Sequence, residues 1–175
     1  MRMFFISSTG TEIGKTIVTT ILLRQIRMAN KSVEAIKPII TGFDENNFYK
    51  TDTAMILNEL GREVTKENID QISPWRFKDP ISPNLAAESE GRPLIAEKVV
   101  AFCKSKMQRD QILLIEGIGG VMVPLNDTET VLDLVAKLGA PIVLVVGSYL
   151  GTLSHTLTAF QAVSHYGLKT AGVVI

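Results

Sequence analysis

The sequence predicts an α/β fold in which a doubly wound, mainly parallel sheet is covered by helices on both faces. Short apolar runs rich in β-branched residues alternate with longer segments in which apolar residues recur every three or four positions. This alternation is typical of parallel strands joined by helices. Gly61, Gly139 and Gly167 each follow a segment of helical period, where a left-handed residue would close the helix.

Five compact apolar runs are the predicted strands. In chain order they are Met3 to Ser7, Val33 to Ile40, Ile112 to Glu116, Pro141 to Gly147 and Thr170 to Ile175. Within the second run, Lys37 is followed by Pro38, which cannot donate a hydrogen bond to a neighbouring strand. We therefore expect that strand to end or to break at this point.

The amphipathic segments between these runs are the predicted helices. They are Lys15 to Ala29, Asp52 to Leu60, Leu94 to Met107, Val131 to Leu138 and Thr152 to Tyr166. From Pro74 to Pro93 the helical period lapses, and we interpret this stretch as a long loop of the kind that often carries function. We expect residues 1–175 to form a single domain. Because its last strand lacks a covering helix, we expect the C-terminal portion of the fold to be missing.

The composition favours a cytoplasmic protein over a nucleic-acid-binding or membrane protein. Lys+Arg and Asp+Glu both number 18, so no net charge attracts nucleic acid or an anionic membrane. A single cysteine, Cys103, excludes an intrachain disulfide and a multi-thiolate metal site, and it indicates a reducing compartment. The apolar runs are shorter than the roughly 18 residues of a membrane span, and the N-terminal run is too short for a signal peptide.

A glycine-containing loop from Ser8 to Thr16 follows the first predicted strand and leads directly into a helix. The order of strand, loop, Gly-Lys-Thr and helix is typical of a P-loop, in which backbone N–H groups and the positive end of the helix surround a phosphate. Lys15 would reach the β- and γ-phosphates and Thr16 would ligate Mg²⁺. Gly10 stands one residue later than the first glycine of the standard motif. A solvent-facing turn is the alternative.

Two acidic residues are candidate metal ligands. Glu116 ends a very apolar run and precedes Gly117-Ile118-Gly119-Gly120, so a doubly wound sheet would deliver it to the same edge as the phosphate loop. A carboxylate there suits Mg²⁺, and the glycines would let nucleotide or substrate pass close to the backbone. The alternative for Glu116 is a solvent-facing acid. Asp52 opens a helix, and its position alone indicates an N-cap.

Lys37 is a charged residue within an apolar strand. If the strand ends there, the lysine would face the same crevice as the phosphate loop. The alternative is a lysine that extends from an edge strand into solvent. Cys103 shares the apolar face of its helix with Val99 and Phe102, so we interpret it as a core residue.

Several motifs together resemble the dethiobiotin synthetase family, and the resemblance covers nearly the whole chain. In order they are Thr11-Glu12-Ile13-Gly14-Lys15-Thr16, Lys37-Pro38-Ile39-Ile40-Thr41-Gly42, Pro80-Ile81-Ser82-Pro83, Glu116-Gly117-Ile118-Gly119-Gly120-Val121 and Val145-Val146-Gly147-Ser148-Tyr149-Leu150-Gly151. The chain departs from the family at Ser8, where the family has glycine, and at Gly10, where the family usually has an acid.

The resemblance implies a P-loop NTPase-like enzyme that uses ATP and Mg²⁺ to convert 7,8-diaminopelargonic acid and CO₂ into dethiobiotin. It implies Lys15 and Lys37 as the catalytic residues. It implies that the nucleotide is bound by Thr11, Glu12, Ile13, Gly14, Lys15, Thr16, Glu116 and Gly119, and the metal by Thr16, Asp52 and Glu116. It implies that the substrate is bound by Thr41 and Pro80 and, from the neighbouring subunit of a homodimer, by Gly151, Thr152, Leu153 and Ser154.

Three alternatives remain at this point. A deviant P-loop switch ATPase of the partitioning type shares the fold, but such proteins usually carry another lysine near the start of the loop, where this chain has Ser7-Ser8-Thr9-Gly10. An amidotransferase-type synthetase would need a glutaminase domain. A nucleotide-binding module without catalytic activity is the third.

Overall fold

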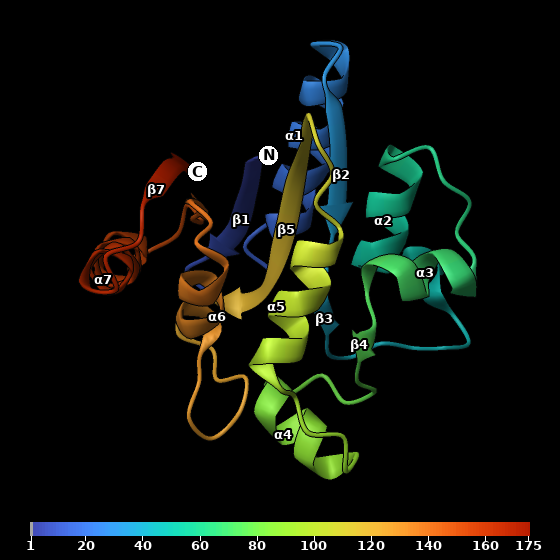
Figure 1. Cartoon of the computed structure of the whole chain (residues 1–175). Helices are drawn as coiled ribbons and strands as arrows, with labels where there is room; N and C mark the ends of the chain where they lie inside the picture. The colour runs from blue at the N-terminus through green and yellow to red at the C-terminus, as the bar shows by residue number, and fades with distance from the viewer. Residues whose placement is uncertain (1) are drawn as a thin grey trace.

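The computed structural model describes residues 2–175, and its centre is a sheet of five parallel strands in the order β2-β5-β1-β6-β7 (Figure 1). Every neighbouring pair is parallel, which confirms the predicted fold class. The strands are β1 (Arg2–Ser8), β2 (Ser32–Ile36), β5 (Gln111–Gly120), β6 (Ile142–Val145) and β7 (Thr170–Val174).

All five predicted helices form, within one or two residues of their expected ends. They are α1 (Lys15–Met28), α2 (Asp52–Glu59), α5 (Ala96–Ser105), α6 (Val131–Leu138) and α7 (Thr152–His165). Figure 1 shows α1 behind the sheet and α5 and α6 in front of it. The glycines expected to close helices have the left-handed backbone, with φ of 71° at Gly61 and 67° at both Gly139 and Gly167.

The core lies on both faces of the central strands. Phe5 and Ile6 are consecutive in β1, and both are buried. Because consecutive side chains of a strand point to opposite faces, the two burials show that both faces are covered. Leu23 of α1 and Val135 of α6 are also fully buried. No helix within residues 2–175 has both the length and the apolar character needed to cross a bilayer.

The second predicted strand breaks at Lys37 and Pro38, as expected. β2 ends at Ile36, and Ile39–Ile40 forms β3, which pairs in parallel with β4 (Trp75–Arg76) in a separate two-stranded sheet. The carbonyl of Pro38 accepts the backbone N–H of Trp75 at 3.0 Å. The chain therefore leaves the main sheet immediately after delivering Lys37.

The interpretation of residues 74–93 as one long loop was wrong. This stretch contains β4 and the helix α4 (Pro83–Ser89). Pro83 lies at the first turn of α4, where proline is favoured because its missing N–H would have no partner in the helix. The helix α3 (Lys66–Ile72) and the short 3₁₀ helix η1 (Phe48–Lys50) were not predicted. Each is too short to show several turns of apolar period.

Cys103 is fully buried in α5, as predicted for a core residue. Burial raises the pKa of its thiol to about 12, and the thiolate is the form that reacts with disulfide reagents. We expect no reaction with such a reagent at about pH 8 in the native protein, and one equivalent after unfolding in guanidinium. Absorbance of the released thiol measures both. A fast native reaction would place Cys103 at the surface.

Candidate active site

The phosphate loop joins β1 to α1 at the carboxyl end of the central strand. β1 lies between β5 and β6 in the sheet, so the loop emerges at the middle of the sheet edge. Gly14 precedes α1 with φ of 98°, and Glu12 also has a left-handed backbone, with φ of 58°. The first turn of α1 offers backbone N–H groups and the positive end of its dipole, which together favour an anion.

Lys15 is folded back over the loop. Its Nζ donates to the Ser8 hydroxyl at 3.0 Å and to the Gly10 carbonyl at 3.1 Å. Ser8 is fully buried, and its hydroxyl also lies 3.0 Å from the Gly119 carbonyl, to which it can donate. The serine that replaces the family's glycine thus gives the lysine an acceptor within the loop. Burial, followed by the nearby charge of Lys37, lowers the pKa of Lys15 to about 8.

Glu116 is a buried carboxylate with three donors. It lies in β5 beside Ile6 of β1. Its Oε1 accepts from the Thr16 hydroxyl at 2.6 Å and from the Lys37 ammonium at 2.8 Å, and its Oε2 accepts from the Thr19 hydroxyl at 2.7 Å. Buried carboxylates need such bonds because they have lost water. The alternative of a solvent-facing acid is thereby excluded.

Lys37 links the two predicted metal carboxylates. Lys37 is 5 % exposed, and its ammonium contacts both Asp52 and Glu116. Burial alone would lower the pKa of Lys37, but the two carboxylates raise it above its ordinary value. The lysine is therefore charged and held inside the site. This position excludes a lysine that extends into solvent.

Asp52 reaches the site from the start of α2. The cap of α2 is Thr51, whose hydroxyl accepts the backbone N–H of Ala54 at 3.3 Å, so the interpretation of Asp52 as an N-cap was wrong. Burial opposes the charge of Asp52, but Lys37 and then Thr16 hold the pKa of the carboxyl below its usual range. Asp52 is thus free of a structural capping role and carries a full negative charge.

A cavity of about 590 Å³ opens beside the phosphate loop. Most of the residues predicted from the sequence line it, and they are Thr11, Glu12, Gly14, Lys15, Thr16, Lys37, Thr41, Asp52, Pro80 and Gly119. Glu116 lies behind Thr16 and Lys37, with 1 % of its surface exposed. Ile13 packs against the core and contributes its backbone to the loop.

Thr41 and Pro80 reach this cavity through the small sheet. The backbone N–H of Gly42 donates to the Asp79 carbonyl at 3.1 Å, which continues the pairing of β3 with β4. Gly42 has φ of 73°, and a Cβ added there would lie 3.0 Å from the Cβ of Pro80. The close approach and the left-handed backbone both require glycine.

The glycines after Glu116 mainly make room for the chain itself. A Cβ on Gly117 would lie 2.6 Å from the Phe5 ring, and one on Gly120 would lie 3.3 Å from the backbone of Thr9 and Gly10. The expectation that these glycines serve nucleotide or substrate applies only to Gly119, which lines the cavity. The missing side chain at Gly120 instead allows the phosphate loop to pack closely against β5.

The start of α7 lies apart from this cavity. Gly151 precedes the helix with φ of 96°, and the Thr152 hydroxyl donates to the Gly147 carbonyl at 2.5 Å. Leu153 is 78 % exposed and Ser154 is also exposed. The structure therefore does not bring these four predicted substrate residues to the phosphate site of the same chain.

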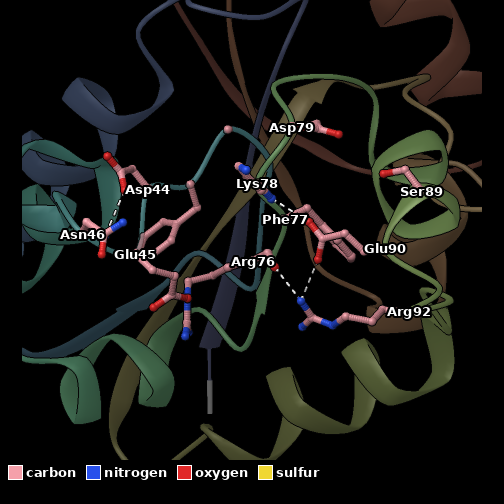
Figure 2. A pocket seen from close by; sticks show the side chains of 12 residues that line it. Asp44, Glu45, Asn46, Arg76, Phe77, Lys78, Asp79, Ser89, Glu90 and Arg92 are labelled. Atoms are coloured by element: carbon pink, nitrogen blue, oxygen red, sulfur yellow. Dashed lines mark hydrogen bonds and ion pairs between the residues drawn. The ribbon is translucent and has the colours of Figure 1, made fainter.

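A larger hollow of about 890 Å³ lies next to the two-stranded sheet, lined among others by residues 42–46 and 76–79 (Figure 2). Its two arginines are already paired: Arg76 with Glu45 at 3.1 Å and Asp70 at 2.7 Å, and Arg92 with Glu90 at 3.0 Å. Figure 2 shows Arg92 between Glu90 and the backbone carbonyl of Arg76. Such paired charges stabilise loops, and we assign the chemistry to the smaller cavity.

The donor set at the phosphate loop fits Mg²⁺. Thr16, Asp52 and Glu116 offer hydroxyl and carboxylate oxygens, which are the ligands this cation prefers. Both carboxylates contact the ammonium of Lys37, so this place is already built to hold positive charge. Among residues 2–175, no group of three or more His, Cys, Asp or Glu could hold a metal ion. Mg²⁺ requires no such group, because it usually retains waters and phosphate oxygens.

The parallel sheet, the Gly-Lys-Thr loop and the adjacent carboxylates define a P-loop nucleotide-binding protein. Two solved structures share the fold. The BceF tyrosine kinase domain matches with a TM-score of 0.58 at 16 % identity, covering 99 % of this chain and 67 % of that one. The kinase domain of Escherichia coli tyrosine kinase ETK matches with a TM-score of 0.52 at 14 % identity, covering 99 % and 66 %. At these identities the likeness shows the fold alone.

Sequence comparison is more specific. The family profile described as AAA domain matches residues 2–175. The ATP-dependent dethiobiotin synthetases of Caulobacter sp. and Acidiphilium cryptum are both 43 % identical over 177 residues, covering 100 % of this chain and 76 % and 79 % of theirs. That of Cellvibrio japonicus is 35 % identical, covering 99 % of this chain and 75 % of its own. The chain belongs to the ATP-dependent dethiobiotin synthetase family.

Proposed function

We propose that this protein condenses 7,8-diaminopelargonic acid with CO₂ at the expense of ATP, giving dethiobiotin, ADP and phosphate. The observation that carries the proposal is the convergence of two buried lysines and two acidic side chains on one phosphate loop. Nucleotide binding alone explains Lys15 and Thr16. It does not explain Lys37, which comes from a separate strand and shares the same site.

The chemistry requires that an oxygen of CO₂ be removed. One amine captures CO₂ as a carbamate and loses a proton, and a carbamate oxygen then attacks the γ-phosphorus while ADP leaves. The second amine attacks the carbonyl carbon of the resulting mixed anhydride and loses a proton, phosphate departs with the carbamate oxygen, and a cyclic urea remains. Each step develops negative charge on phosphoryl or carbamate oxygens, so fixed positive charge lowers its barrier.

The residues of the cavity supply this charge from different elements. Lys15, at the start of α1, faces the β- and γ-phosphates once it leaves Ser8 and Gly10. Lys37, at the end of β2, neutralises the carbamate and the transferred phosphoryl group. Thr16, Asp52 and Glu116 would hold Mg²⁺, which when bound neutralises charge on the phosphate oxygens. Glu12 and Thr41 line the nucleotide and substrate sides.

The carboxylate of the substrate needs a further partner. Among the described residues that line the cavity, none is an arginine. Leu153 and Ser154 in the first turn of α7 are exposed, and the backbone N–H groups of a first helical turn favour an anion. Leu150 and Leu153, beside this start, are 104 % and 78 % exposed, as expected for apolar residues that a second copy covers. We propose a homodimer in which the start of α7 binds the substrate carboxylate for the neighbouring subunit.

Ser154→Asp is expected to raise the apparent KM for the diamino acid while leaving that for ATP nearly unchanged. The new charge would lie at the start of α7 and repel the substrate carboxylate alone. Steady-state kinetics with each substrate varied in turn measure both constants. Ser164→Asp adds the same charge near the end of the same helix, at an exposed position, and is the control. Equal effects of Ser154→Asp on both substrates, or none, would contradict this placement.

An assay of ATP hydrolysis tests the proposed function as a whole. We expect phosphate release to require both diaminopelargonic acid and bicarbonate, with dethiobiotin formed in equal amount. A switch ATPase of the partitioning type would hydrolyse ATP without either compound.

The absence of net charge is consistent with small-molecule substrates in the cytoplasm rather than nucleic acid or a membrane as partner.

A further inference from the structure

Thr19 is a fully buried hydroxyl residue close to Thr16 on α1. It lies three residues beyond Thr16, so both side chains share one face of the helix. The Thr19 hydroxyl lies 2.7 Å from Oε2 of Glu116 and 2.9 Å from the Lys15 carbonyl. Because Thr19 has no exposed surface, it lies out of reach of nucleotide and substrate. Any part it has in the reaction is indirect.

The single proton of the hydroxyl goes to the carboxylate. A hydroxyl can donate only once, and hydrogen bonds to an ionised acceptor are roughly twice as strong as those between neutral groups. The Lys15 carbonyl already has the backbone N–H of Thr19 as its helical partner. The bond from Thr19 to Glu116 is therefore the one that the hydroxyl makes.

The two oxygens of Glu116 have different surroundings. Oε1 contacts Thr16 and Lys37, and both of these line the cavity. Oε2 contacts Thr19, which is buried within the protein. If Thr16 and Lys37 exchange partners when ligands bind, the bond from Thr19 is unaffected, because Thr19 lies outside the cavity.

We propose that Thr19 is a positioning residue for the metal carboxylate. Its hydroxyl holds Oε2 of Glu116 so that Oε1 faces the cavity, where Mg²⁺ binds. The inference rests on the metal role of Glu116 in the proposed function. Removing a group that orients a metal ligand typically lowers metal affinity or activity by roughly 10- to 100-fold. The competing explanation is that Thr19 is a packing residue whose hydroxyl bonds only to its own helix.

Two substitutions separate these explanations. Thr19→Val keeps the shape of the side chain and removes the hydroxyl, whereas Thr19→Ser keeps the hydroxyl and removes a methyl group. Isothermal titration calorimetry would measure the Kd of ADP with Mg²⁺ and with EDTA. The Kd with EDTA divided by the Kd with Mg²⁺ gives the contribution of the metal to binding. We expect Thr19→Val to reduce this ratio about 10-fold and Thr19→Ser to keep it within about 2-fold. An unchanged ratio in Thr19→Val would overturn the proposal.

A second measurement does not depend on metal or nucleotide. Urea unfolding of the ligand-free protein would be followed for Thr19→Val, for Glu116→Leu, which has no acceptor for the Thr19 hydroxyl, and for the double variant. If Thr19 acts on Glu116, the two effects are not additive, because each variant removes the same bond. Additive effects would show that Thr19 only packs, and would overturn the proposal. Neither measurement requires dethiobiotin formation, so a failure of the proposed reaction would be recognised separately.

Discussion

Lys37→Gln is expected to abolish dethiobiotin formation while nucleotide affinity changes only a few fold. Glutamine has a similar length and preserves packing at this buried position, but it carries no charge where the carbamate and the transferred phosphoryl group develop theirs. The loss of one such interaction raises the barrier by roughly 3–4 kcal/mol. Product formation measured over hours, together with calorimetric titration of ATP, would check both parts.

The matched control for this variant is Lys31→Gln. Lys31 is exposed and lies before β2, so the same loss of charge there should leave turnover unchanged. Near-normal turnover in Lys37→Gln would show that the pairing with Asp52 and Glu116 only stabilises the fold. Loss of nucleotide binding would instead assign Lys37 to the phosphate site in the ground state.

Glu116→Gln is expected to raise the Mg²⁺ concentration needed for half-maximal activity by at least about 10-fold. An amide oxygen has no formal charge for a hard dication. The amide also places N–H donors where Thr16, Thr19 and Lys37 already donate, so one of these groups loses its acceptor. A metal titration of the activity measures the shift.

Asp52→Asn is expected to shift the metal requirement in the same direction but less. The side chain of Asp52 is 46 % exposed, whereas that of Glu116 has no exposed surface. Water can therefore replace part of the interaction between Asp52 and the metal ion. The shift in the Mg²⁺ requirement should therefore be larger for Glu116→Gln than for Asp52→Asn. If the titration of Asp52→Asn overlays that of the parent, Asp52 is only the first residue of α2.

The fold and the phosphate loop were predictable because their signals are local. The strand up to Ser8, the Gly-Lys-Thr sequence and the helix after it are contiguous. Hydrophobic periodicity predicts the strand and the helix, and the Gly-Lys-Thr sequence is itself the motif. Lys37 and Asp52 were different. The strand break places Lys37 at the crevice of the phosphate loop but leaves an edge-strand lysine as the alternative, and the position of Asp52 alone indicates a helix cap. The family resemblance was needed to assign both residues to the site with Glu116.

What the sequence did not show depends on contacts between distant segments. β3 and β4 have two residues each, and such strands exist only because Pro38 to Phe43 pairs with Trp75 to Asp79. The bond from Thr19 to Glu116 spans 97 residues. Its one sequence signal is a second threonine three residues after Thr16, a spacing that predicts a shared helix face but not the partner of the hydroxyl.

The strand break after Lys37 means that the cavity is built by two separate parts of the fold. The main sheet and α1 carry the residues of the phosphate loop, while Thr41 and Pro80 lie next to the two-stranded sheet of β3 and β4. Substitutions in this two-stranded sheet can reshape the wall formed by Thr41 and Pro80, where we propose that the acceptor binds, without displacing Lys15, Thr16 or Glu116. An enzyme built in this way can exchange one acceptor for another during evolution and retain its apparatus for using ATP.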